Sequence, residues 1–209
     1  MADFDLSKGQ TFDLTKAAPN VSRFYVGMGW TSPEAYDLDV SLFPCRINAA
    51  GDPELLSPPY FIWYNNLESP CKGLIHSPDN RDGVDGLSPT GLPTKDDEWI
   101  QMDLSKIDSQ IVELSFIVTI HEAAQKGHNF KKVQDAFIRI CEMDAAGEPT
   151  REIVKYNLKE DGGDNYAVQF GSLTKKPSGN WEFEALGAGF KTDLGTIIKQ
   201  FMPGASVKG

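Results

Sequence analysis

The chain has 209 residues, a length that fits one domain over residues 1–209 and allows a sizeable buried core. Its content of 40% hydrophobic and 24% charged residues is ordinary for a soluble globular protein. The formal net charge of −10 argues against non-specific nucleic-acid binding, and it disfavours adsorption to anionic membranes unless a bound divalent ion reverses the local sign.

The cysteines and the amino-terminal segment indicate a reducing, cytoplasmic location. Cys45, Cys71 and Cys141 are odd in number and widely spaced, which predicts neither a disulfide framework nor a zinc site. The opening MADFDLSKGQ has no cationic start and no apolar stretch, so it does not resemble a signal peptide. The longest apolar run, at 116–120, is far shorter than the roughly 20 residues of a membrane span, so we expect no transmembrane segment.

Alternating apolar and polar residues predict many short β-strands. The clearest is 111–120, in which Leu114, Phe116 and Val118 share one face while Glu113 lies on the other. Further strands are expected from Thr11, Arg23, Asp39, Tyr60, Trp99, Ala136, Glu152, Tyr166 and Trp181. Turn sequences separate them, for example Asp-Gly-Gly and Ser-Gly-Asn. This spacing predicts an all-β fold, an antiparallel sandwich or barrel.

Few helices are expected. Within 193–201 the apolar residues follow the spacing of one buried helical stripe, with Asp193 as a candidate cap and Pro203-Gly204 as a stop. A second short helix is expected at 129–133.

The most informative segment is the acidic loop at 77–100. Its carboxylates outnumber its only two cations, Arg81 and Lys95. They are Asp79, Asp82, Asp85, Asp96, Asp97 and Glu98. Two unit charges about 4 Å apart interact by roughly 4 kcal/mol at an effective dielectric constant near 20, so such clustering needs water, extension or a bound cation to relieve it. Numerous hard oxygen donors on a glycine-containing loop suit Ca²⁺ better than Mg²⁺, which demands a tight octahedral site. A solvated acidic connection is the alternative interpretation.

Two further polar clusters lie at strand ends. Asp37 and Asp39 open a predicted strand, and alternation places both on one face. Asn65 and Asn66 close another. These residues and the acidic loop can converge at one end of a sandwich, although the asparagines also suit ordinary turns.

Signals for catalysis are weak. The segment HEAAQ, from His121, does not fit the H-E-x-x-H zinc motif, and no G-x-S-x-G nucleophile motif occurs. A metal-assisted hydrolase would depend on His76 or His121 as its base. We therefore expect no enzymatic activity.

Taken together, the motifs resemble the TerD family of bacterial tellurite-resistance and stress proteins, over nearly the whole chain. The matching segments are LSKGQTFDLTKAAPNVSRFYVGMGW from Leu6, DLDVS at 37–41, FIWYNNLESP at 61–70, DN at 79–80, DDEWIQMDLSKI at 96–107, FIVTIHEAAQKGHNFKKVQDAFIRI at 116–140, YNL at 156–158 and WEFEALGAGF at 181–190.

The resemblance implies a two-sheet β-sandwich with calcium as its cofactor, bound in acidic loops at one end. It also implies a non-catalytic, cytoplasmic role in tellurite resistance and the general stress response. Partners would be other proteins of a tellurite-resistance system at the membrane. The implied metal ligands are Asp37, Asp39, Asn66, Asp79, Asn80, Asp96, Asp97 and Glu98.

The loop departs from the family pattern at one place. Residues 87–95 separate its glycine-rich half from the Asp-Asp-Glu triplet, which bears on the remaining candidates Asp82, Gly83 and Asp85. Because loop-closure entropy grows slowly with length, the insertion is compatible with binding. Leu87 and Leu92 within it suggest an alternative function, a calcium-dependent module that binds membrane lipid or a small ligand.

Overall fold

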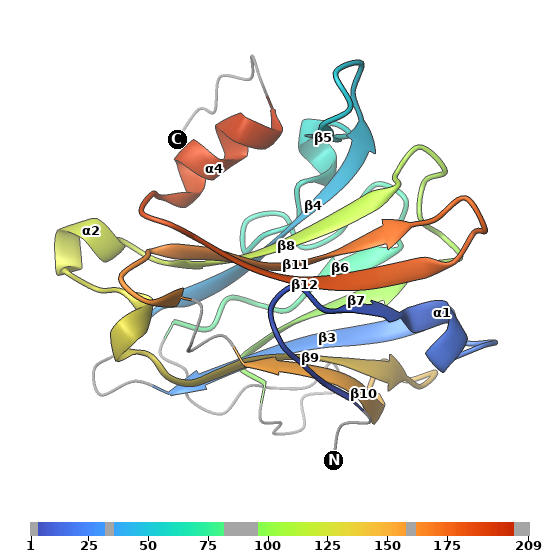
Figure 1. Cartoon of the computed structure of the whole chain (residues 1–209), viewed down its shortest axis with the longest axis horizontal. Helices are drawn as coiled ribbons and strands as arrows, with labels where there is room; N and C mark the ends of the chain where they lie inside the picture. Colours follow the sequence, from blue (N-terminus) through green and yellow to red (C-terminus); the bar gives the residue numbers. More distant parts are fainter. Residues whose placement is uncertain (1–3, 32–35, 82–95, 158–161, 203–209) are drawn as a thin grey trace.

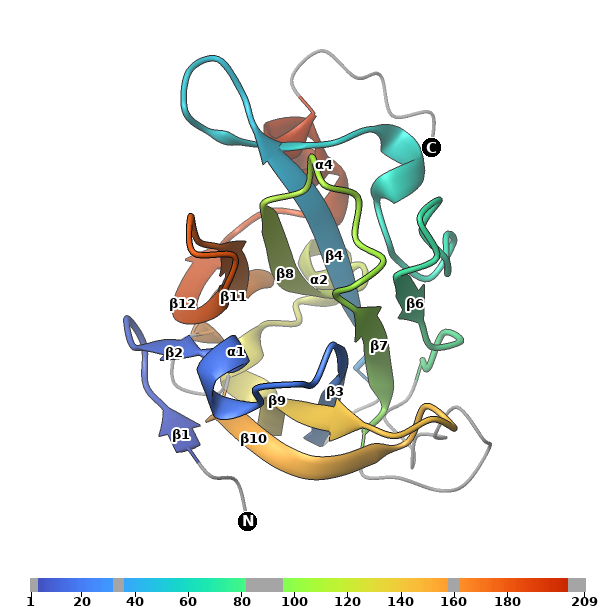
Figure 2. The same cartoon turned by 90° about the vertical axis from the view of Figure 1, so that its right-hand side faces the viewer.

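The fold consists of two six-stranded sheets, which Figure 1 shows as two layers. The computed structural model describes residues 4–31, 36–81, 96–157 and 162–202. Figure 2, turned by 90°, shows the strands of both layers around a shared interior. This architecture confirms the predicted β-sandwich with a few short helices.

The first sheet has one parallel edge. In spatial order its strands are β1 (Phe4–Leu6), β10 (Pro149–Asn157), β9 (Gln134–Met143), β3 (Arg23–Thr31), β7 (Glu98–Asp103) and β6 (Leu74–His76). Neighbouring strands are antiparallel except β1, which pairs with β10 in parallel. No hairpin joins β1 to β10, so no turn imposes the antiparallel direction that the sequence pattern predicted throughout.

The second sheet is antiparallel throughout. In spatial order its strands are β2 (Thr11–Asp13), β12 (Trp181–Phe190), β11 (Ala167–Lys175), β8 (Glu113–Ile120), β4 (Leu38–Ile47) and β5 (Pro53–Leu55). The strands β4 and β8 occupy neighbouring places in it and carry one side of the site described below.

The core lies between the sheets and follows the predicted alternation. On β8, Leu114, Phe116 and Val118 are fully buried in one cluster with Phe24 of β3 and Ile138 of β9. Burying an apolar side chain of this size contributes roughly 1.5–3 kcal/mol, so these contacts hold the two sheets together.

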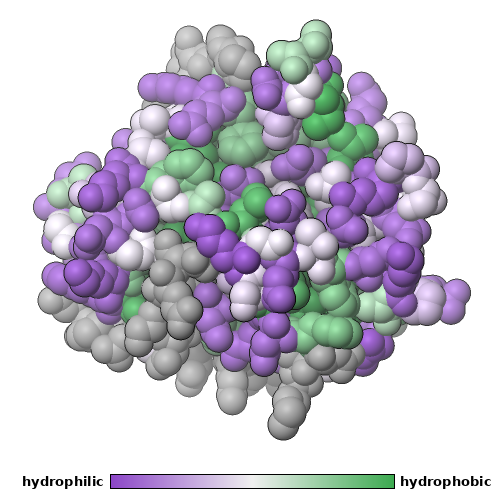
Figure 3. All heavy atoms as spheres, viewed as in Figure 1, coloured by the Kyte–Doolittle hydropathy of each residue, from purple (hydrophilic) through white to green (hydrophobic). Residues whose placement is uncertain are grey.

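The outer face of the second sheet is covered by α4 (Leu194–Phe201), which Figure 1 shows on the side of that sheet away from the first. Ile197 and Ile198 pack against Ile117 of β8, so both faces of β8 are apolar. The Asp193 carboxylate accepts a hydrogen bond from the Thr196 N–H at 2.7 Å, which confirms the predicted helix and its cap. Figure 3 shows hydrophobic side chains gathered beside this helix, on a face that is otherwise mostly hydrophilic.

The other helical segments are single turns. They are α1 (Leu14–Ala17), α2 (Ala123–Lys126), and the 3-10 turns η1 (Pro58–Tyr60) and η2 (Phe130–Lys132). The helix expected at 129–133 is thus a 3-10 turn. No helix in the described parts of the chain is long and apolar enough to cross a membrane.

One predicted strand is wrong. The segment that begins at Tyr60 forms no strand of its own: Tyr60 ends η1, and the residues after it make only two isolated bridges, Ile62 to Leu42 of β4 and Trp63 to Asn66. The two prolines of η1 provide no N–H for a strand ladder, so no strand leads into the apolar run YFIWY from its amino-terminal side.

The amino-terminal segment contributes to both sheets. Its β1 lies at the edge of the first sheet and its β2 at the edge of the second. Figure 1 shows the blue segment crossing from the first layer to the second. Gly9 lies between these strands at φ 80°, and its N–H donates to the Ala185 carbonyl of β12.

Candidate metal centre

Three carboxylates, those of Asp37, Asp39 and Asp79, converge at one end of the sandwich. One oxygen atom of each lies within 4.8 Å of the others. They line a cavity of about 420 Å³ whose remaining walls are Tyr64, Arg81, His121, Glu122 and Lys126. Asp37 and Asp79 are 42 positions apart in the sequence, so the cluster is assembled by the fold and not by the local sequence.

The two sheets supply different members of the cluster. Asp39 belongs to β4, and Asp37 lies directly before this strand. Asp79 follows the end of β6, in the other sheet. The His121 N–H donates to the Asp37 carbonyl at 2.8 Å, which ties the start of β4 to the residue after β8. The predicted convergence of distant acidic segments therefore occurs for these three residues.

The base of the cluster, at Asp39, is buried and has no ion-pair partner among the described residues. Asp39 is only 4% exposed, and no hydrogen bond or ion pair from a described residue reaches its carboxylate. The Asp37 Oδ1 atom is buried and likewise without a hydrogen-bond partner in this part of the molecule. Burial, with repulsion from Asp37 and Asp79, raises the pKa of Asp39 to about 7, and burial also raises the pKa of Asp37.

The outer wall of the cavity carries cations, each already paired. The Arg81 Nε atom lies 2.9 Å from Asp79 Oδ2, and the Lys126 Nζ atom lies 3.1 Å from Glu122 Oε2. Arg81 is largely exposed and the members of the other pair are about half exposed, so each pair contributes little to stability. At the base of the cavity, by contrast, Asp37 and Asp39 have no such partner among the described residues.

Glu98 is fully buried close to this cluster, where it bonds to backbone. Its Oε2 atom accepts a hydrogen bond from the Val40 N–H at 2.7 Å, while Oε1 has no partner among the described residues. Burial raises the pKa of Glu98 well above its ordinary value. Val40 is also approached by His76, whose Nε2 atom lies 2.8 Å from the Val40 carbonyl oxygen.

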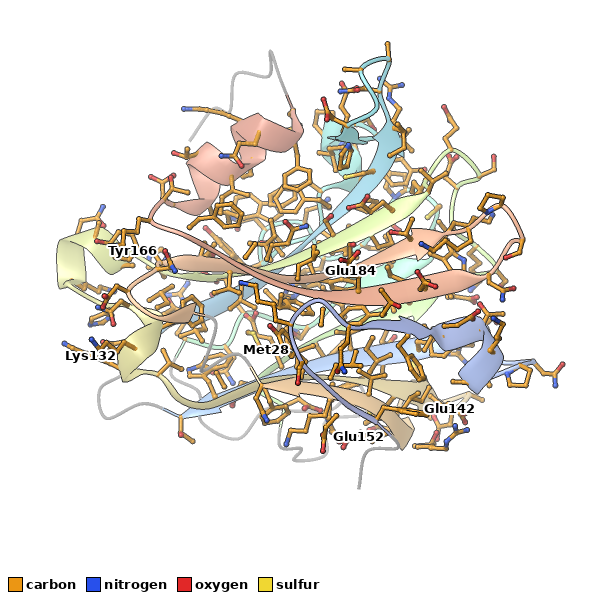
Figure 4. All side chains as sticks on the ribbon, viewed as in Figure 1. Met28, Lys132, Glu142, Glu152, Tyr166 and Glu184 are labelled. Carbon is orange, nitrogen blue, oxygen red and sulfur yellow. The ribbon has the colours of Figure 1, made fainter. Side chains whose placement is uncertain are left out.

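Asp96 lies apart from the cluster, in an ion pair on the first sheet. Its carboxylate is fully buried and receives Arg139 of β9, with Nη2 2.6 Å from Oδ2 and Nε 2.9 Å from Oδ1. Arg139 also contacts Glu152 of β10, which Figure 4 labels at the outer side of this sheet. A Cβ atom on Gly27 would lie 2.4 Å from the Asp96 carboxyl carbon, so only glycine leaves room for this pair.

The side chains of Asp97 and Asn66 also bond to backbone groups. Asp97 Oδ2 accepts from the Trp30 N–H at 2.9 Å. The Asn66 amide donates to the carbonyls of Pro59 and Phe61, at 2.9 and 2.7 Å. The structure thus does not bring these two predicted ligands to the carboxylate cluster.

The remaining predicted ligands lie in or beside the acidic loop. Asn80 follows Asp79 directly and is half-buried. Asp82, Gly83 and Asp85 lie outside the described residues, as do the insertion at 87–95 and its two leucines.

Sequence reasoning missed most of the cavity wall. Tyr64, Glu122 and Lys126 carried no motif, although the i,i+4 spacing of the last two is that of a helical ion pair. Glu122 has a left-handed backbone, with φ 53°, at the start of α2. Such a conformation is uncommon for a residue with a side chain and tends to mark functional segments, but it is invisible in the sequence.

Comparison with known proteins agrees with the fold and the motifs. The model of the TerD domain matches residues 2–201. General stress protein 16U of Bacillus subtilis (strain 168) is 36% identical over 201 residues, covering 94% of this chain and 95% of that protein. Tellurium resistance protein TerD of Serratia marcescens is 35% identical over 207 residues, covering 96% and 98% respectively.

A solved structure supports the architecture. The crystal structure of a homologue of telluride resistance protein (TerD) from Streptomyces coelicolor A3(2) aligns with a TM-score of 0.65 and 19% identity, covering 86% of this chain and 96% of that one. At this identity the likeness concerns the fold alone. Because the domain model spans nearly all of the sequence and full-length relatives align almost end to end, the chain belongs to the TerD domain family.

Proposed function

We propose that this protein binds a calcium ion through the carboxylates of Asp37, Asp39 and Asp79. The observation that carries the proposal is the buried, unpartnered Asp39 carboxylate, which points into a cavity shared with two more carboxylates. An ionised carboxylate without a counter-charge is costly to bury, and a cation supplies that charge. Three carboxylates and one arginine leave a local charge of −2, which one divalent ion neutralises.

The donor set fits calcium in kind. Carboxylate oxygens are hard ligands, and calcium accepts 6–8 of them in loose geometry. Three carboxylates offer up to six oxygens, and the cavity of about 420 Å³ has room for water or further oxygen ligands. Magnesium prefers a compact octahedral site and keeps most of its waters, which this wide, multi-segment cavity does not favour.

The proposed role of the ion is structural. It neutralises the three carboxylates and holds the start of β4 against the segment after β6, so that the two sheets are joined at this end. We propose that this ordered end forms a surface for a protein partner. The protein would act without catalysis, in the cytoplasm, in tellurite resistance and the general stress response. Its proposed partners are other proteins of a tellurite-resistance system at the membrane.

Calorimetric titration with CaCl₂ tests the ion site. Wild type should bind calcium, and Asp39→Asn should abolish or strongly weaken binding, because it removes the most buried of the three charges. Asp97→Asn is the matched control. It removes a carboxylate of the same loop whose described contact is with the Trp30 N–H, and it should retain most of the affinity. Wild type that releases no heat and shows no stabilisation with calcium would refute the proposal.

A further inference from the structure

Two buried polar side chains of the first sheet bond to the N–H and the carbonyl of Val40, next to the candidate metal site. Glu98 of β7 accepts the Val40 N–H at 2.7 Å, and His76 of β6 lies with its Nε2 2.8 Å from the Val40 carbonyl oxygen. Val40, Glu98 and His76 are 2%, 0% and 2% exposed, so water does not compete for these bonds.

The arrangement replaces a missing strand neighbour. On one side β4 pairs with β8, with Val40 opposite Val118. On its other side β5 pairs with β4 only from Cys45 to Ile47, and an isolated bridge serves Leu42. Val40 lies two residues before Leu42, so its N–H and carbonyl point to the same unpaired side. Glu98 and His76 reach across from the first sheet to satisfy both groups.

The His76 bond connects the segments that carry Asp39 and Asp79, and the Glu98 bond restrains the first of them. The Val40 N–H belongs to the peptide unit that Asp39 begins, so Glu98 restrains the backbone directly under the Asp39 side chain. His76 ends β6, three residues before Asp79. The His76–Val40 bond therefore spans from the segment of Asp79 to that of Asp39, and its length sets how closely the two can approach.

We infer that His76 and Glu98 are positioning residues of the cation site, which fix the separation of Asp39 and Asp79 through the backbone N–H and carbonyl of Val40. The inference rests on the proposed cation site and assigns these two side chains a role through backbone hydrogen bonds. It makes a different prediction from direct coordination by Glu98, because a hydrogen bond to Val40 requires only an acceptor, whereas coordination requires the negative charge.

Conservative and disruptive substitutions separate the two roles. Glu98→Gln keeps an oxygen acceptor for the Val40 N–H, and His76→Gln keeps a donor at the position of Nε2. Glu98→Ala removes the bond to the Val40 N–H, and His76→Ala removes the bond to the Val40 carbonyl. Calcium affinity, measured by calorimetric titration, should fall about 10–100-fold in the alanine variants, as it does when groups that orient metal ligands are removed. Each glutamine variant should recover most of that loss.

A stability control distinguishes positioning from general loss of structure. Leu173 is fully buried towards the other end of β11, and Leu173→Ala should lower the melting temperature in chelator without changing calcium affinity. If Glu98→Gln weakens binding as much as Glu98→Ala, Glu98 acts through its charge and the inference fails. It also fails if the alanine variants bind like wild type. If wild type binds no calcium, both the proposed function and this inference fail. If wild type binds calcium but the variants do not behave as described, only this inference fails.

Discussion

Asp39 combines deep burial with an adjacent cavity, and this makes its protonation informative. Its pKa is raised from 3.8 to about 7 in the ion-free fold, chiefly by burial. When the pKa of a carboxyl is higher in the folded than in the unfolded state, the free energy of unfolding falls as the pH rises between the two values, here between about pH 4 and pH 7. The fall is up to about 1.4 kcal/mol per pKa unit of difference.

The prediction for pH follows from that sign. In chelator, the difference in melting temperature between Asp39→Asn and wild type should increase in favour of the variant from pH 5 to pH 8. Comparing the two proteins removes the contribution of other carboxyls, such as Asp103, whose pKa is lowered by hydrogen bonds from Ser105 and Lys106 despite its partial burial. Because protons and calcium compete for Asp39, calcium affinity of wild type should rise over the same interval. A pH-independent difference between the proteins would contradict this prediction.

The cysteines differ sharply in burial, and their reactivity should follow. Cys45 and Cys141 are fully buried, and burial raises the pKa of both thiols, that of Cys141 to about 12. Cys71 is only half-buried. Because the thiolate is the reactive form, Ellman's reagent should label one thiol of the native protein rapidly and three in denaturant. Cys71→Ser should abolish the rapid phase. Rapid labelling that persists in this variant would contradict the burial of Cys45 and Cys141.

Among the elements, β3, β7 and β9 are joined by the buried pair of Asp96 and Arg139. Removing one partner of such a pair leaves an uncompensated charge, which costs about 3–5 kcal/mol. We therefore expect Arg139→Leu to lower the free energy of unfolding by that amount in urea denaturation. Combining it with Asp96→Asn should recover a large part, since the variants act on one interaction. Strictly additive losses would show that the pair is not coupled.

The strands with alternating residues were predictable because their periodicity reflects a core between two sheets. Three-residue strands such as β1, β5 and β6 were missed, since so few residues show no period and their pairing depends on distant segments. The stripe of α4 predicted the helix, but only the fold revealed that it covers Ile117, which explains the second apolar face of β8.

The site was predictable in part for the same reason. Asp37 and Asp39 share a face by alternation, and the structure brings Asp79 to them. The described contacts of Asp96, Asp97 and Asn66 involve Arg139, Trp30 and the carbonyls of Pro59 and Phe61, partners that no local spacing indicates. Charge density in the loop therefore indicated one member of the carboxylate cluster, Asp79, whereas the positions of its other described carboxylates depended on tertiary contacts.

For the molecule as a whole, the proposed calcium ion between β4 and the segment after β6 should act on global stability. Calcium at about 100 times its dissociation constant adds about 2.7 kcal/mol to the free energy of unfolding. For a domain of this size that is a rise in melting temperature of roughly 5–10 °C. Magnesium should give a smaller rise, and Asp39→Asn none. Superimposable melting curves in calcium, magnesium and chelator would exclude the joining of the sheets by the ion.

The amino-terminal segment has a consequence for how the protein can be handled. Since β1 covers β10 and β2 covers β12, a truncation that begins at Leu14 would uncover the backbone of one long strand in each layer simultaneously. Bare strand edges recruit other chains. Such a shortened protein should aggregate upon expression.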